Sequence, residues 1–292
     1  MAGVAVAPAG RGAPDAHGKP EFEVTGGRGR ISLQGVRELW QFREVLGAFV
    51  VRQVKVRYKQ AALGVGWAVL QPMLAALVFA LFLGRLAHLK SEGAPYMAFA
   101  LAGTVCWSFF SGAAGGAMDS IVTDQAILRK VYFPREIFPL AAVLASLLDI
   151  VAGLCTFAVT ALALGLRPHL ALLALPVPIL LLVLTSLALG LGLSAVNVYY
   201  RDVRYVLPFV FQLGIFVTPV IYSLSVVPGH WRTPYEVLNP LAAAIDGLRR
   251  IALHGTWPQL MPTVLAFAWA LLLAAGALSL FKRLERGFAD RI

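Results

Sequence analysis

Residues able to do covalent chemistry are few in this sequence and are not grouped. The five histidines are dispersed, no H-E-x-x-H sequence occurs, and no Cys-His spacing suits a metal ion. A phosphate-binding P-loop is missing, because the only Gly-Lys pair, Gly18 and Lys19, is followed by Pro20. A G-x-S-x-G nucleophile elbow is missing as well. We therefore predict that the chain is not an enzyme, binds no metal or cofactor, and cannot hydrolyse a nucleotide alone by the P-loop mechanism.

Asp149 is the one acidic residue well inside a long apolar stretch. A carboxylate is costly to bury in lipid, so such a residue is a candidate for function. A hydrogen bond between helices, or a position facing a water-filled channel, explains it equally well, and a single acid is thin support for proton coupling. Cys106 and Cys155 also lie in apolar stretches, and we interpret them as small buried hydrophobic residues.

The basic residues that give the net charge of +10 cluster beside apolar runs rather than on a polar domain. This placement is typical of the cytoplasmic ends of membrane helices and argues against a nucleic-acid partner. One dense group is Lys55, Arg57 and Lys59 around Tyr58. Anchoring in lipid headgroups is one explanation of these cations.

The elements that must position these residues are membrane helices, because 59% of the 292 residues are hydrophobic and only 14% are charged. Six segments have the roughly 20 apolar residues needed to cross a hydrocarbon core of about 30 Å. We predict an all-α integral membrane protein with spans at about 63–83, 96–118, 137–166, 170–198, 206–222 and 262–281. The fifth span is short and contains Pro208 and Pro219.

Two segments precede the first span. Residues 1–30 are rich in Gly, Ala and Pro and lack the apolar core of a secretory signal, so we predict a mobile cytoplasmic tail. Residues 31–60 carry apolar side chains at helical spacing with charges on much of the other side. This pattern predicts an amphipathic helix that lies in the inner headgroup layer, and a soluble helix packed on a partner domain is the alternative.

The distribution of Lys and Arg sets the orientation of the six spans. With both termini in the cytoplasm, 17 of these residues flank the spans on the inner side and six lie in outer loops. Because basic loops are retained in the cytoplasm, we predict this topology.

The outer loop between the fifth and sixth spans is predicted to contain a helix over 239–255. Asn239 followed by Pro240 is typical of a helix start, and Gly255 of a helix end. We expect this segment to dip into the outer leaflet as part of an exit or gate, and a helix lying on the surface is equally compatible with its pattern.

Two inner loops combine charges with aromatic residues. The loop that starts at Asp119 has an apolar and basic helical turn over 127–132, followed by a break at Pro134, and the other loop starts at Asn197. We interpret both as docking elements for a partner protein. Simple retention of positive charge on the inner side would explain the charges alone.

Four segments in combination resemble the permease subunit of ABC-2-type polysaccharide exporters, which move O-antigen, capsule, teichoic acid and related lipid-linked glycans. They are VKVRYKQAALGVGWAVLQPM (54–73), ILRKVYFPREIFPLA, NVYYRDVRYVLP, and TPVIY followed by LNPL. The resemblance implies a homodimer in the bacterial inner membrane, with two copies of a separate ATPase subunit that binds ATP and Mg²⁺. The nearest alternative is another ABC-2 permease, one that exports a drug or lipid. Less favoured alternatives are a membrane glycosyltransferase, a membrane acyltransferase and a proton-coupled carrier.

The resemblance also implies roles for individual residues. Coupling to the ATPase would involve Ile127, Leu128, Arg129, Lys130, Tyr132, Phe133, Arg135, Arg201 and Asp202. The lipid-linked substrate would enter beside Lys55, Arg57, Tyr58 and Lys59, where the cations suit the diphosphate of a lipid carrier. A channel between subunits, along which a glycan slides, would be lined by Trp67, Phe79, Phe82, Phe209, Phe211, Phe216 and Tyr222.

Overall fold

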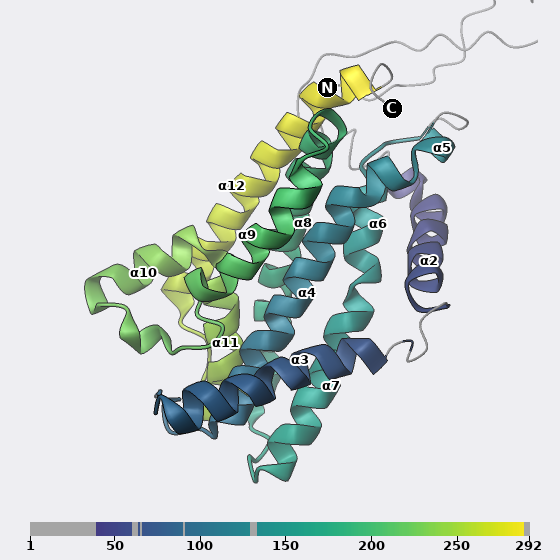
Figure 1. The fold of residues 1–292 in the computed structure, drawn as a ribbon. Helices are drawn as coiled ribbons and strands as arrows, with labels where there is room; N and C mark the ends of the chain where they lie inside the picture. The colour runs from purple at the N-terminus through teal and green to yellow at the C-terminus, as the bar shows by residue number, and fades with distance from the viewer. Residues whose placement is uncertain (1–38, 60–63, 65, 90, 129–132, 289–292) are drawn as a thin grey trace, which may run out of the picture.

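The computed structural model describes residues 39–59, 64, 66–89, 91–128 and 133–288. Within these ranges the protein is helical and contains no β-strand, which confirms the predicted all-α fold class. The tail predicted over 1–30 lies outside the described residues. The described part of the predicted amphipathic helix contains α2 (Arg43–Lys59), which lies beside α6 (Figure 1).

Among the residues that the structure describes, five helical segments are long and apolar enough to cross a membrane. They coincide with five of the predicted spans. They are α3 (Gly66–Phe79) with the π-helix η1 (Ala80–Leu86), α4 (Tyr96–Thr123), α6 (Ile137–Ala145) with α7 (Leu147–Ala163), η2 (Leu170–Ala174) with α8 (Pro176–Tyr199), and α12 (Leu260–Leu284) with η4 (Glu285–Gly287).

The remaining predicted span, 206–222, is a shorter helix in the structure. Helix α9 (Val203–Val217) has 15 residues, or about 22 Å at 1.5 Å per residue. It ends five residues before the predicted boundary, because Thr218 is extended and precedes Pro219, which disfavours helical backbone at the residue before it.

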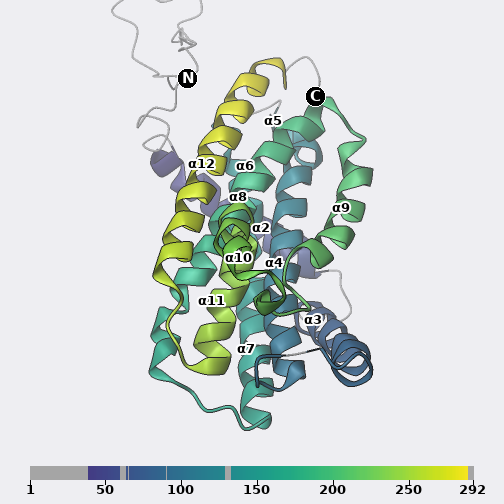
Figure 2. The same cartoon turned by 90° about the vertical axis from the view of Figure 1, so that its left-hand side faces the viewer.

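Helices α4 and α8 form the centre of the bundle. Helix α4 packs against α3, α6, α7 and α8, and α8 packs in turn against α11 and α12 (Figures 1 and 2). Small residues bring α4 and α8 together: a Cβ added at Gly190 would lie 2.6 Å from the Cβ of Ala117. Close approach through small residues is typical of membrane helices, which cannot gain stability by removing apolar surface from water.

The segment after α9 folds back into the bundle through η3 (Leu224–Val226), α10 (Gly229–Leu238) and α11 (Pro240–His254). Helix α11 begins at Pro240 and ends before Gly255, whose φ of 65° is left-handed, as the sequence predicts. The Asn239 side chain does not cap this helix; its amide donates instead to Thr218 Oγ1 at 3.1 Å. The side chains of Ile245, Leu248 and Ile251 are at most 1% exposed. This burial favours a helix packed into the bundle over one lying on its surface.

Arg249 of α11 holds the extended chain after α9 in place. Its guanidinium is buried and donates to three backbone carbonyls, those of Pro219 at 2.7 Å, Val220 at 2.5 Å and Tyr222 at 3.2 Å. The guanidinium also lies 3.5 Å from the ring centroid of Phe99. The three hydrogen bonds satisfy backbone carbonyls of the non-helical segment that follows α9. From the sequence, Arg249 was counted only among the charges of the predicted outer loops.

Helix α4 accommodates this contact because residue 103 is glycine. A Cβ there would lie 2.2 Å from the carbonyl oxygen of Val220 and 2.7 Å from an Arg249 Nη atom. We expect Gly103→Ala to lower the free energy of unfolding by about 2 kcal/mol, although alanine is the better helix former by about 1 kcal/mol. Thermal unfolding of the purified protein measures this. The matched control is Gly276→Ala in α12, where the added Cβ meets no atom within 4 Å. Equal unfolding temperatures for the two variants would contradict the packing argument.

Candidate functional site

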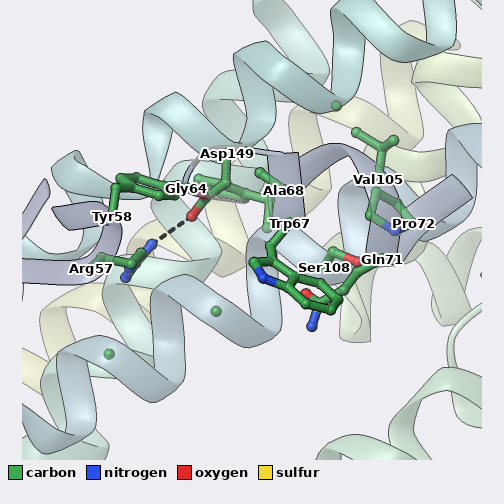
Figure 3. Close-up of a pocket in the computed structure, with 14 residues that line it drawn as sticks. Arg57, Tyr58, Gly64, Trp67, Ala68, Gln71, Pro72, Val105, Ser108 and Asp149 are labelled. Atoms are coloured by element: carbon green, nitrogen blue, oxygen red, sulfur yellow. Dashed lines mark hydrogen bonds and ion pairs between the residues drawn. The ribbon is translucent and has the colours of Figure 1, made fainter. Parts of the chain in front are cut away.

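The carboxyl end of α2 turns two of its side chains toward α7. Arg57 Nη1 lies 2.5 Å from Asp149 Oδ2 and 3.2 Å from Ser146 Oγ, and the Tyr58 hydroxyl donates to the other oxygen of Asp149 (Figure 3). The structure therefore joins two features that the sequence left separate, the isolated acid and part of the basic group. Asp149 has a partner in the same chain, so neither an unpaired buried charge nor a proton relay is needed to explain it.

These three residues form one wall of a cavity of about 430 Å³ between α2, α3, α4 and α7 (Figure 3). Trp67 and Gln71 of α3 and Ser108 of α4 line the same cavity. Space is left because α4 presents Gly112 and Gly116 at this surface. A Cβ added at Gly112 would meet no heavy atom within 4 Å.

The cavity carries a balanced charge. The guanidinium of Arg57 and the carboxylate of Asp149 compensate each other, and both side chains are half-buried. Burial and the hydrogen bond to Asp149 raise the pKa of Tyr58 to about 12, so its hydroxyl stays protonated at neutral pH. Arg57 is therefore already paired and is not a free cation for a phosphate.

Lys55 and Lys59 lie on the other side of α2, with Arg52. These three residues line a second cavity of about 410 Å³ together with Val51. Arg52 Nη2 pairs with Asp124 Oδ1 at 2.7 Å, whereas the two lysines have no ion pair within the described part of the chain. The residues predicted to meet the incoming substrate therefore divide between two faces of one helix.

An apolar groove of about 470 Å³ continues from this basic face. It shares Val51 and Lys55 with the second cavity and reaches α6 and α7. Its other lining residues are Val50, Val54, Leu144, Leu147, Leu148 and Val151. Cations beside an apolar groove suit an amphiphile with an anionic head.

The predicted coupling residues are also divided by the structure. Phe133 is buried against Phe49 and Phe138, and Arg135 donates to the carbonyl of Glu285 at 3.1 Å and lies over the ring of Phe288. Arg201 and Asp202 are exposed in the turn before α9. Ile127 and Leu128 belong to α5 (Gln125–Leu128), and Ile127 is partly buried. Arg129, Lys130 and Tyr132 lie outside the described residues.

A contact that the sequence did not indicate links the two loops that were predicted to lie on the inner side. Arg204 Nε lies 3.1 Å from Asp119 Oδ1, and the Asn197 side-chain amide donates to the carbonyl of Met118 at 3.2 Å. Beside this contact the rings of Tyr200 and Tyr205 are 69% and 78% exposed. The carboxyl end of α4 and the turn between α8 and α9 thus form one surface.

The predicted channel aromatics have different surroundings. The exposed ones, on α3, η1 and α9, are Trp67, Phe82, Phe209 and Phe216. Phe211 packs against Trp107 and Phe110, Phe79 is partly buried, and the Tyr222 hydroxyl lies 3.0 Å from that of Tyr235. A single chain therefore leaves apolar faces of α3 and α9 uncovered.

Comparison with known proteins covers most of the chain. The sequence profile of the ABC-2 type transporter family matches residues 44–253. The chain is 31% identical over 258 residues to the O-antigen export system permease protein RfbA of Myxococcus xanthus, covering 88% of this chain and 98% of that protein. Two proteins of Klebsiella pneumoniae with the same name are 26% and 25% identical over 263 residues, which is 89% of this chain and 99% of each.

Proposed function

Because the chain belongs to the ABC-2 type transporter family, we propose that it is the membrane-spanning permease subunit of an ATP-driven exporter of polysaccharide. The observation that carries this proposal is the alignment with O-antigen export permeases over nearly their full length. An alignment of that extent covers the helices that would form the path, not a single shared motif.

We further propose that the permease works as a homodimer in the bacterial inner membrane, with both termini in the cytoplasm and two copies of a separate ATPase subunit. The uncovered aromatic faces of α3 and α9 support a second copy, because these faces are apolar and carry ring surfaces on which sugars can slide. ATP and Mg²⁺ would bind to the partner subunit. This chain would form the path for the glycan across the membrane and would change conformation in response to ATP hydrolysis by the partner subunit.

The substrate would be a glycan linked to a lipid diphosphate. The basic face of α2 supports this, since Lys55 and Lys59 are exposed and adjoin the apolar groove that reaches α6 and α7. An anionic head held by the lysines, with its hydrocarbon tail in the groove, fits the chemistry of both surfaces.

Depletion of the chain in its native host tests the function. We expect surface polysaccharide to fall by more than tenfold and lipid-linked glycan to accumulate in the cytoplasm, because the glycan cannot cross the hydrocarbon core unaided. Fractionation of cells followed by detection of the glycan measures both. Restoring the permease from a plasmid is the control. If surface glycan is unchanged while a drug or a lipid accumulates, the chain is a permease for that other substrate.

A further inference from the structure

The cavity bounded by Arg57, Asp149, Trp67, Gln71 and Ser108, here called the α2–α4 cavity, is distinct from the basic face of α2. Its one positive and one negative charge are paired with each other, and the structure places no further charged side chain among its described lining residues. An anion gains little from a cation that already has a partner. The cavity therefore disfavours a phosphate group and favours an uncharged ligand.

Polar groups in the cavity exclude a purely hydrocarbon ligand. The side chains of Gln71 and Ser108 make no hydrogen bond to any described residue, so an amide and a hydroxyl are free to pair with a guest. The Asp149 carboxylate and the Arg57 guanidinium add further acceptors and donors at the opposite wall. A guest that offers several hydroxyl groups satisfies this set, whereas an alkyl chain would leave it unsatisfied.

An aromatic face completes the lining. Trp67 is 46% exposed and borders the cavity next to Gln71, as Figure 3 shows. Indole rings pack on the CH faces of flat, hydroxylated rings while polar groups at the rim bind their hydroxyls. The volume of about 430 Å³ lies within the range of roughly 300–1,000 Å³ found for small-molecule sites.

We propose that the α2–α4 cavity binds a neutral sugar ring of the exported glycan, with Trp67 as the stacking surface and Gln71, Ser108 and Asp149 as hydrogen-bond partners. This inference rests on the proposed function and makes it more specific. The two faces of α2 then recognise two parts of one substrate: the basic face meets the lipid diphosphate, and the cavity meets a sugar ring near it. A free lipid carrier would occupy only the first.

Photo-crosslinking in cells tests this division. In the test variant a photoreactive side chain replaces Gln71, which is exposed and lines the cavity. In the control variant the same photoreactive side chain replaces Leu77, which is exposed on the same helix but does not line the cavity. The complete exporter is expressed in cells that make the glycan and in cells that make the lipid carrier without the glycan. We expect a sugar-bearing adduct at position 71 in the first cells and no lipid adduct there in the second.

A second experiment fills the α2–α4 cavity with a leucine side chain and compares this variant with one that adds leucine elsewhere. In Gly112→Leu the new side chain enters the cavity without meeting an atom at its Cβ, and Gly276→Leu adds the same side chain at an exposed, equally open helical glycine of α12. We expect Gly112→Leu to reduce the adduct at position 71 and the export of glycan by about tenfold, as the loss of several hydrogen bonds would. Gly276→Leu should leave both unchanged. Recovery of each variant with its ATPase checks folding, and Gly112→Ala replaces Gly112→Leu if the latter is not recovered.

Three results would overturn the inference. They are an adduct at position 71 that persists in cells without glycan, an adduct that the filled cavity does not reduce, and no adduct at all in cells whose export is normal. Failure of the proposed function is a separate result, since depletion of the chain would then leave surface glycan unchanged.

Discussion

Asp149→Ala is expected to lower the free energy of unfolding by about 2 kcal/mol, because it leaves the half-buried Arg57 without its counter-charge and Tyr58 without its acceptor. The full penalty for breaking a buried ion pair is about 3–5 kcal/mol. The smaller value is expected here because the Arg57 and Asp149 side chains are 32% and 21% exposed, which lets water compensate part of the loss.

A double-mutant cycle separates the pair from its surroundings. The cycle compares Arg57→Gln, Asp149→Asn and the double variant with the unchanged protein, and the double loss minus the sum of the single losses is the coupling energy of the pair. Because the double variant leaves no unpaired charge, we expect it to lose less stability than the two single losses added together. Asp119→Ala is the matched control, because its partner Arg204 is 47% exposed and such a pair contributes at most about 1 kcal/mol. Chemical unfolding of the purified variants measures all of them. Equal losses for Asp149→Ala and Asp119→Ala would show that the α2–α7 contact contributes no more than a surface pair.

The parts of the fold that the sequence predicts are those controlled by local rules. A run of apolar residues long enough to cross a membrane is visible without tertiary information, and five of six predicted spans have a long apolar helix in the structure. The ends of α11 follow from Pro240 and from Gly255, whose left-handed backbone suits glycine. The end of α9 was predicted too late because apolarity continues past Val217, whereas the Thr218-Pro219 step stops the helix.

The basic residues at the end of α2 were treated as one group, although they lie on two faces of the helix. Adjacent helical residues are about 100° apart, so positions 55 and 57 point in nearly opposite directions. Helical spacing alone therefore predicts that Lys55 and Arg57 face different surfaces, even though they are close along the chain. The partner of Arg57 could not be predicted, because Asp149 is 92 residues away and only the packing of α2 and α7 brings it near.

The loop predicted as the main docking element gives a second example of contacts that the sequence does not indicate. Phe133 and Arg135 have the residue types of a docking element, yet both contact other parts of this chain. Their hydrophobic and cationic side chains have partners in α2, α6 and the chain end near Phe288, and no local rule indicates those contacts.

Charge reversal at the two predicted coupling arginines should therefore have different effects. Arg135→Glu would place a carboxylate beside Glu285 and Glu136 and remove the bond to the Glu285 carbonyl, so we expect a loss of about 2–3 kcal/mol in unfolding free energy. Arg201→Glu lies in an exposed turn, and the Arg201 side chain makes no ion pair or hydrogen bond to the described residues. We expect it to change stability by less than about 0.5 kcal/mol.

Among correctly folded variants, Arg201→Glu should weaken binding of the ATPase more than Arg135→Glu does. Arg201 lies beside the exposed rings of Tyr200 and Tyr205, so its reversal is expected to weaken ATPase binding by about tenfold at unchanged permease stability. Titration of the ATPase onto permease in nanodiscs, with unfolding measured on the same samples, separates the two effects. Arg167→Glu, an exposed arginine in the loop between α7 and η2, is the control and should bind ATPase normally. Since stability is unaffected, normal ATPase binding by Arg201→Glu would mean that the turn between α8 and α9 is not a docking surface.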